Sequence, residues 1–99
     1  MVVHILDVAP GADTASQGAA VFARLQQELA DHNAQVVFSF EGVKTATSSF
    51  VNVAFVQLLS SFSFADIKAR LRIVNSTRQI NDMIRSCMER EARQGSVAA

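Results

Sequence analysis

Short β-branched segments alternate with amphipathic helical segments along the chain, and this alternation limits the fold more than any other feature. Strands are predicted at residues 2–8, 35–40 and 69–74, where Val, Ile, Phe and Leu are concentrated. A helical segment follows each of them, so the order is β-α-β-α-β-α. Because strands joined by helical crossovers run parallel, the sequence predicts an α/β fold with a three-stranded, mostly parallel sheet.

Capping boxes mark two of the helix starts. In this motif a Ser or Thr hydroxyl and a following Gln or Glu side chain satisfy each other's unpaired backbone N–H groups. Thr14 with Gln17 and Ser76 with Gln79 have this pattern. The first helix is expected to end near residue 32 or 33, and the last near Gly95.

The middle helix, predicted at residues 48–62, is apolar on more than one side. Its core stripe has helical spacing and consists of Val51, Ala54, Phe55, Leu58, Leu59 and Phe62. Away from this stripe, Phe50, Val53 and Val56 form a second apolar edge. Either another layer of the same domain covers this edge or a partner does, because exposed apolar patches commonly mark contacts.

The third strand is polar on one face. Arg70 and Arg72 alternate with Leu71 and Ile73, and Ser39 interrupts the second strand. Strands of a parallel sheet that is covered on both faces read as continuous apolar runs. We therefore expect a β-α-β-α-β-α superhelix whose helices lie mainly on one face of the sheet.

Length and composition exclude several classes of protein. With 99 residues the chain can form one core, and we expect a single domain at residues 1–95 with a frayed tail at 96–99. Nine basic residues balance nine acidic ones, unlike a general nucleic-acid-binding protein. The longest apolar stretch, at residues 50–59, is shorter than the roughly 20 residues of a membrane helix, and no secretory signal is apparent. Cys87 is the single cysteine, which is typical of a cytoplasmic protein.

Three segments of the chain carry a family resemblance: VVFSFEGV at 36–43, TSSF at 47–50 and LRIVN at 71–75. They resemble the STAS-like domains, small bacterial relatives of the sulphate-transporter and anti-sigma-factor-antagonist domain. The resemblance covers about residues 35–90 and implies a STAS-like fold. In the antagonist domains a partner kinase phosphorylates a Ser or Thr at this helix start, so the resemblance implies that role for Ser48 or Ser49. Ser39, Asn52 and Val53 stand where the family usually has acidic residues.

Ser48 and Ser49 have two interpretations. A hydroxyl at a helix start accepts a hydrogen bond from an unpaired backbone N–H and thereby caps the helix. A phosphate there would be stabilised by the same donors and would add about two negative charges. Residue type and position alone favour capping, and the resemblance adds the phosphorylation switch.

The remaining candidates for chemistry are few. Arg70 and Arg72 would suit a small-anion or nucleotide site, although a solvated strand face is favoured because no Gly-rich phosphate loop accompanies them. His4, His32 and Cys87 have no metal-ligand or catalytic spacing, and Cys87 is expected to be a buried structural thiol. No catalytic residue, metal or cofactor is predicted.

These observations predict a non-enzymatic regulatory module that binds a protein partner through Ser48, Ser49 and the second helix, with Phe50, Val53 and Val56 in contact. By family analogy alone, the partner is a kinase-type ATP-binding protein. One alternative is a homo-oligomeric structural domain that uses the apolar helix edge as its subunit interface. Another is a small-anion or nucleotide-binding domain. Neither nucleic acid nor a membrane is an expected partner.

Overall fold

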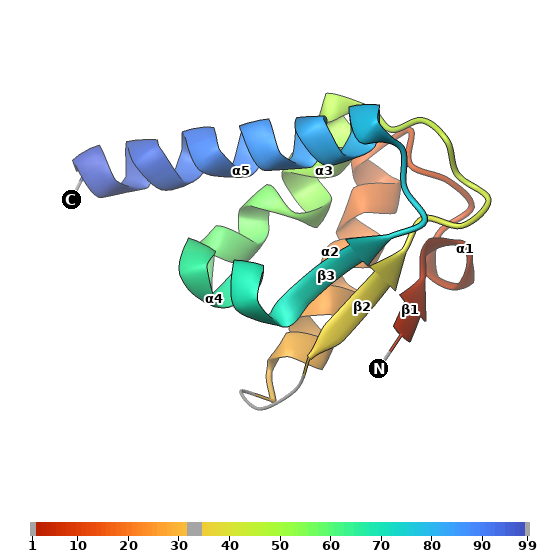
Figure 1. Ribbon diagram of the computed structural model, residues 1–99, viewed down its shortest axis with the longest axis horizontal. Coiled ribbons are helices and arrows are strands. Elements are labelled where there is room, and N and C mark those ends of the chain that lie inside the picture. Colours follow the sequence, from red (N-terminus) through yellow and green to blue (C-terminus); the bar gives the residue numbers. More distant parts are fainter. Residues whose placement is uncertain (1, 32–34, 99) are drawn as a thin grey trace.

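The sheet of this protein has three parallel strands in the order β1-β2-β3 (Figure 1). The computed structural model describes the backbone of residues 2–31 and 35–98, and the side chains of this part as far as residue 93. The strands are β1 (Val2–His4), β2 (Val36–Ser39) and β3 (Leu71–Val74). The predicted α/β class with a three-stranded parallel sheet is confirmed.

Helices connect the strands and pack against one face of the sheet (Figure 1). Their bounds are α1 (Ile5–Val8), α2 (Ala15–Leu29), α3 (Ser48–Ala54), the 3-10 helix η1 (Val56–Ser60), α4 (Phe64–Arg70) and α5 (Arg78–Ala98). The predicted capping box at Thr14 and Gln17 is present at the start of α2. The one predicted at Ser76 and Gln79 is wrong, because Thr77 accepts the hydrogen bond from the Ile80 N–H at 3.1 Å at the start of α5. The C-terminal end of α5 extends beyond the rest of the fold (Figure 1).

The two faces of the sheet differ in burial, as the polar alternation of the third strand predicts. Val3 pairs with Phe38 and Phe38 with Ile73, and this row points toward the helices. Val3 and Phe38 are buried there. On the opposite face Arg72 is exposed and Val2 retains 52% of its accessible surface. The described helices therefore cover one face only.

Four fully buried phenylalanines hold α3 against the sheet. Phe38 and Phe40 of the β2 segment meet edge to face with their ring centroids 5.2 Å apart, and Phe55 lies 5.7 Å from Phe38. Phe50 lies 6.5 Å from Phe40 and 6.2 Å from Phe55. Such offset and edge arrangements are the favoured geometries of aromatic pairs. The cluster fixes the start and the end of α3 relative to β2.

Two strands are shorter than predicted because helical turns occupy their ends. The first was expected at residues 2–8, but the Ala9 N–H donates to the Ile5 carbonyl at 2.8 Å and residues 5–8 form α1. The third was expected from residue 69, but α4 continues through Arg70. Ser63 caps α4 by accepting a hydrogen bond from the Asp66 N–H at 3.1 Å. Over so few residues, a helical turn and a strand show similar apolar patterns, so the sequence did not distinguish them.

The predicted middle helix is interrupted at Phe55. The helix α3 ends at Ala54, and the tighter 3-10 helix η1 follows. Residues three apart eclipse in a 3-10 helix, so this change keeps Phe55 and Leu58 on the buried side together.

At the other boundaries, α5 continues to Ala98 rather than ending near Gly95, and the predicted end of the first helix lies outside the described residues.

Among the described residues, no single helix is long and apolar enough to cross a membrane. The segments Ser48–Ser60 and Phe64–Arg70 meet that test only as a pair, and they are bent by 113° relative to each other.

Candidate functional site

Thr47, rather than Ser48 or Ser49, caps α3. Thr47 Oγ1 accepts a hydrogen bond from the Phe50 N–H at 3.2 Å and donates one to the Asp13 carbonyl at 3.0 Å. The predicted capping role of the two serines is therefore wrong. They are the first two residues within α3, and both are exposed. Their hydroxyls lie at the surface and do not cap the helix, so capping does not account for the two serines at this position.

Phe50 and Val53, which were predicted as partner contacts, pack inside the fold. Phe50 is fully buried among the other phenylalanines, so it offers no surface to a partner. Val53 is half-buried and faces α2 at Gly18, where an added Cβ would lie 3.0 Å from the Val53 Cβ. That part of the apolar edge is covered by another layer of the same domain. Val56, in contrast, lines an open groove.

This groove runs between α3 and η1 on one side and α5 on the other. Its first part has a volume of about 580 Å³ and is lined by Ser48, Asn52, Val56, Gln57, Cys87, Arg90 and Glu91. A second part of about 760 Å³ continues from it, because Val56, Gln57 and Glu91 line both. We refer to the two parts together as the η1–α5 groove.

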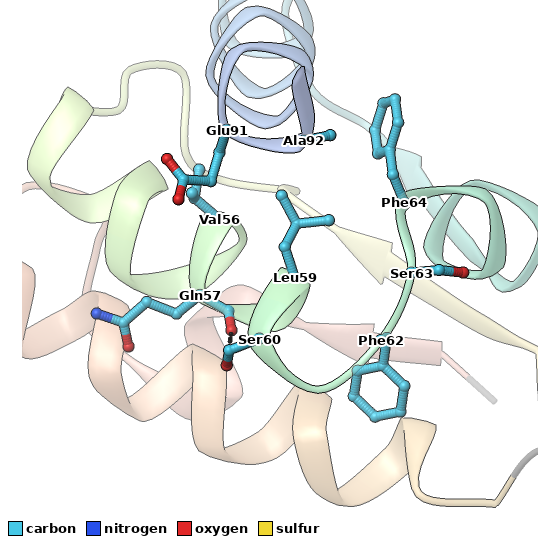
Figure 2. Close-up of a pocket in the computed structure, with 9 residues that line it drawn as sticks. All are labelled: Val56, Gln57, Leu59, Ser60, Phe62, Ser63, Phe64, Glu91 and Ala92. Atoms are coloured by element: carbon cyan, nitrogen blue, oxygen red, sulfur yellow. Dashed lines mark hydrogen bonds between the residues drawn. The ribbon is translucent and has the colours of Figure 1, made fainter. Parts of the chain in front are cut away.

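The second part of the η1–α5 groove has an apolar floor. In Figure 2, Leu59 points across it toward Ala92 of α5, and Phe64 at the start of α4 stands on the far side. Val56, Leu59 and Phe64 pack against the core but are only half-buried. The groove therefore leaves apolar surface accessible between two rims of polar side chains.

Arg70 does not form the predicted anion site, because its side chain is buried at 9% exposure and is already bonded. Its guanidinium donates to Asp66 Oδ2 at 2.9 Å, to the Leu29 carbonyl at 2.7 Å and to the Asp31 carbonyl. Leu29 is the last residue of α2, where helix carbonyls lack partners within the helix, and Asp31 follows just beyond it. Arg70 is thus a structural link between α4 and α2. Arg72 points to the open face of the sheet. Both arginines line a groove of about 340 Å³ at the start of β3, but the Arg70 guanidinium there is already bonded to backbone carbonyls.

The other predicted candidates lie apart from each other. His4 is exposed at the end of β1, with its Nδ1 4.0 Å from Glu41 Oε2. Cys87 is half-buried and lines the first part of the η1–α5 groove. His32 lies outside the described residues. Within the part of the chain that the structure describes, no three His, Cys, Asp or Glu side chains come together as a metal site would require.

Together these features define a small parallel α/β domain with helices on one face and an open groove beside its second helical segment. The model of the family described as a STAS-like domain of unknown function matches residues 17–81, and the chain belongs to this family. The predicted STAS-like resemblance is confirmed. No curated protein and no solved structure gives a significant match.

The family match covers one wall of the η1–α5 groove and not the other. Ser48 and Val56 lie within the matched residues, whereas Cys87, Arg90 and Glu91 lie beyond residue 81. The sequence interpretation included the first wall and missed Arg90 and Glu91. Helical periodicity could have placed them on the polar side of the last helix, but only the packing of α5 across η1 brings them to the groove.

Proposed function

We propose that this STAS-like domain is a non-catalytic regulatory module that binds a protein partner in the η1–α5 groove. The observation that carries the proposal is the half-buried apolar row of Val56, Leu59 and Phe64, which lines an open groove rather than a closed core. Partially exposed apolar side chains with polar rims are typical of protein contact sites. By family analogy, the partner is a kinase-type ATP-binding protein of the bacterial cytoplasm.

Ser48 is the phosphorylation site that we propose for regulating this contact. It is exposed, and it lines the first part of the groove together with Arg90 and Glu91. A phosphate would add about two negative charges there, attracting Arg90 and repelling Glu91. Ser49 is also exposed, but it does not line this part of the groove, and so it serves as the comparison residue.

Site-specific photo-crosslinking in the source cells tests the groove. A crosslinking residue at Val56 or Leu59 is expected to capture the same protein, whereas one at the exposed Gln27 of α2 is not. Val56→Arg should remove the Leu59 crosslink, because it buries a charge in the apolar contact. Capture of that protein equally from Gln27, or crosslinking unaffected by Val56→Arg, would exclude the groove as the contact.

Phosphorylation is tested on the same captured complex. Mass spectrometry of the chain isolated from the cells should find phosphate on Ser48. Ser48→Glu should change capture from Leu59 while Ser49→Glu leaves it unaltered, since only the first charge lies in the groove. Equal effects of the two substitutions, or phosphate on neither serine, would rule out the switch while leaving the groove contact standing.

A further inference from the structure

The outer edge of β3 presents backbone groups that the sheet does not use. Among the described residues β3 pairs with β2 alone. The Val74 carbonyl accepts from the Phe40 N–H at 3.0 Å, so Val74 faces β2. Peptide groups alternate in direction along a strand, and those of Ile73 therefore face outward. An exposed edge of this kind is a template for another strand.

A second groove lies directly beside that edge. It has a volume of about 320 Å³, and β3, α4 and α5 line it. Leu71, Ile73, Phe64, Ile84 and Met88 supply its apolar surface. We refer to it as the β3-edge groove. The other edge of the sheet, at β1, is shorter and turns into α1 immediately after His4.

The charges around the β3 edge favour an acidic occupant. Arg72 projects from the middle of β3 onto the open face, where it is exposed. Lys68 and Arg85 are exposed at the rim of the β3-edge groove, with Glu89 as the acidic lining residue. A second copy of β3 would bring another Arg72 to the same face, which disfavours a symmetric pair.

We propose that the β3 edge binds an extended segment of a partner protein as a fourth strand. Side chains alternate between the faces of an added strand. The residues that point to the helices would be apolar and enter the β3-edge groove, and the intervening ones would be acidic and lie beside Arg72. Backbone hydrogen bonds to Ile73 supply affinity, and the alternation supplies specificity. Phe64 lines both this groove and the η1–α5 groove, but no residue of β3 lines the η1–α5 groove.

Two capped peptides serve as probes, one alternating Val with Glu and one alternating Val with Lys. Added to the isotope-labelled chain, the Glu peptide should perturb the NMR signals of β3 and slow hydrogen exchange of the Ile73 amide. The Lys peptide should bind about fivefold more weakly. Two further Glu peptides carry N-methyl groups on alternate residues, one on the odd positions and one on the even positions. Both keep their side chains, but only one of them loses the N–H groups that face β3. That peptide should lose binding if the peptide pairs as a strand.

Charge reversal at Arg72 tests whether this residue sets the preference for an acidic peptide. Arg72→Glu should invert the preference toward the Lys peptide, whereas Lys44→Glu, the same change in an exposed loop, should leave it unaltered. Three results would overturn the proposal: no perturbation at β3, equal binding of both N-methylated peptides, or a preference insensitive to Arg72→Glu. Sedimentation showing a dimer that Arg72→Glu dissociates would assign the edge to a second copy instead.

Discussion

Arg70 joins two parts of the chain that are far apart in sequence. The sequence places it in an alternating Arg-Leu-Arg-Ile run, which predicts a solvent-facing strand residue. In the structure it is the last residue of α4, and its guanidinium bonds the Leu29 and Asp31 carbonyls. The sequence pattern could not reveal this, because the carbonyls that accept from Arg70 lie 41 and 39 positions away, at the end of α2 and just beyond it.

Replacing Arg70 should therefore destabilise the fold rather than affect anion binding. Arg70→Met keeps the aliphatic stem but removes the donor to the buried Leu29 carbonyl and breaks the ion pair with Asp66, and we expect a loss of about 2–3 kcal/mol in the free energy of unfolding. Arg72→Met, on the exposed face, should change it by less than about 0.5 kcal/mol. Urea denaturation measures both, and similar values for the two variants would contradict the structural role of Arg70.

Thr47 and Ser48 differ in role although they are neighbours with similar side chains. Thr47→Ala removes the hydroxyl that accepts from the Phe50 N–H, and should cost about 1–2 kcal/mol of stability. Ser48→Ala should change stability by no more than about 0.5 kcal/mol, because that hydroxyl caps nothing. Thermal unfolding followed by circular dichroism distinguishes them. A larger loss of stability for Ser48→Ala than for Thr47→Ala would mean that Ser48 caps α3, as the sequence indicated.

At the scale of elements, the packing of α2 against α3 depends on one glycine. Gly18 is buried in the first turn of α2, and a Cβ there would lie 2.7 Å from the Phe50 carbonyl oxygen. Glycine in a helix is otherwise unfavourable, so this position uses a helix-destabilising residue to bring two backbones together. The helix that packs against Gly18 became evident only from the fold.

Gly18→Ala should accordingly destabilise the protein. Helix propensity alone predicts a gain of about 1 kcal/mol, whereas the clash with the α3 backbone predicts a loss of about 1–3 kcal/mol. We expect the clash to dominate, because the contacted atom is backbone and cannot rotate away. Ala19→Gly at the adjacent exposed position calibrates propensity in the same helix. Chemical denaturation that shows Gly18→Ala to be stabilising would mean that α2 and α3 are farther apart than described.

The long helix α2 was predictable from the sequence, whereas the short helix α1 and the break in the middle helix were not. The capping box of Thr14 and Gln17 and the apolar stripe along α2 depend on neighbours within the helix, so the local sequence is sufficient to predict them. The turn at Ile5–Val8 and the break at Phe55 depend on contacts with distant segments, such as Phe38 of β2. The same distinction applies to the η1–α5 groove, whose two walls come from separate parts of the chain.

At the scale of the whole molecule, the sheet has a centre and two dissimilar edges. Among the strands of the described residues only β2 is paired on both sides, and its Phe38 lies in the phenylalanine cluster. β1 is paired on one side, and Val2 is half exposed on the open face. Of the two arginines from which this one-sided architecture was predicted, Arg72 lies on the open face of β3 and Arg70 is buried in α4. The order of the strands was not predictable from the sequence pattern, because it is set by how the crossovers pack.

This architecture predicts an order of local stability. Backbone groups of a strand that is paired on both sides and packed under helices open only with global unfolding. Backbone groups of an edge strand open locally at lower free energy. Native-state hydrogen exchange should therefore show the Phe38 amide exchanging with the full free energy of unfolding and with its full dependence on denaturant. The Val3 amide, which lies in the edge strand β1, should exchange at lower free energy with weaker denaturant dependence. Equal exchange free energies at both positions would mean that the sheet opens as one unit and that the edge strand β1 has no local opening of its own.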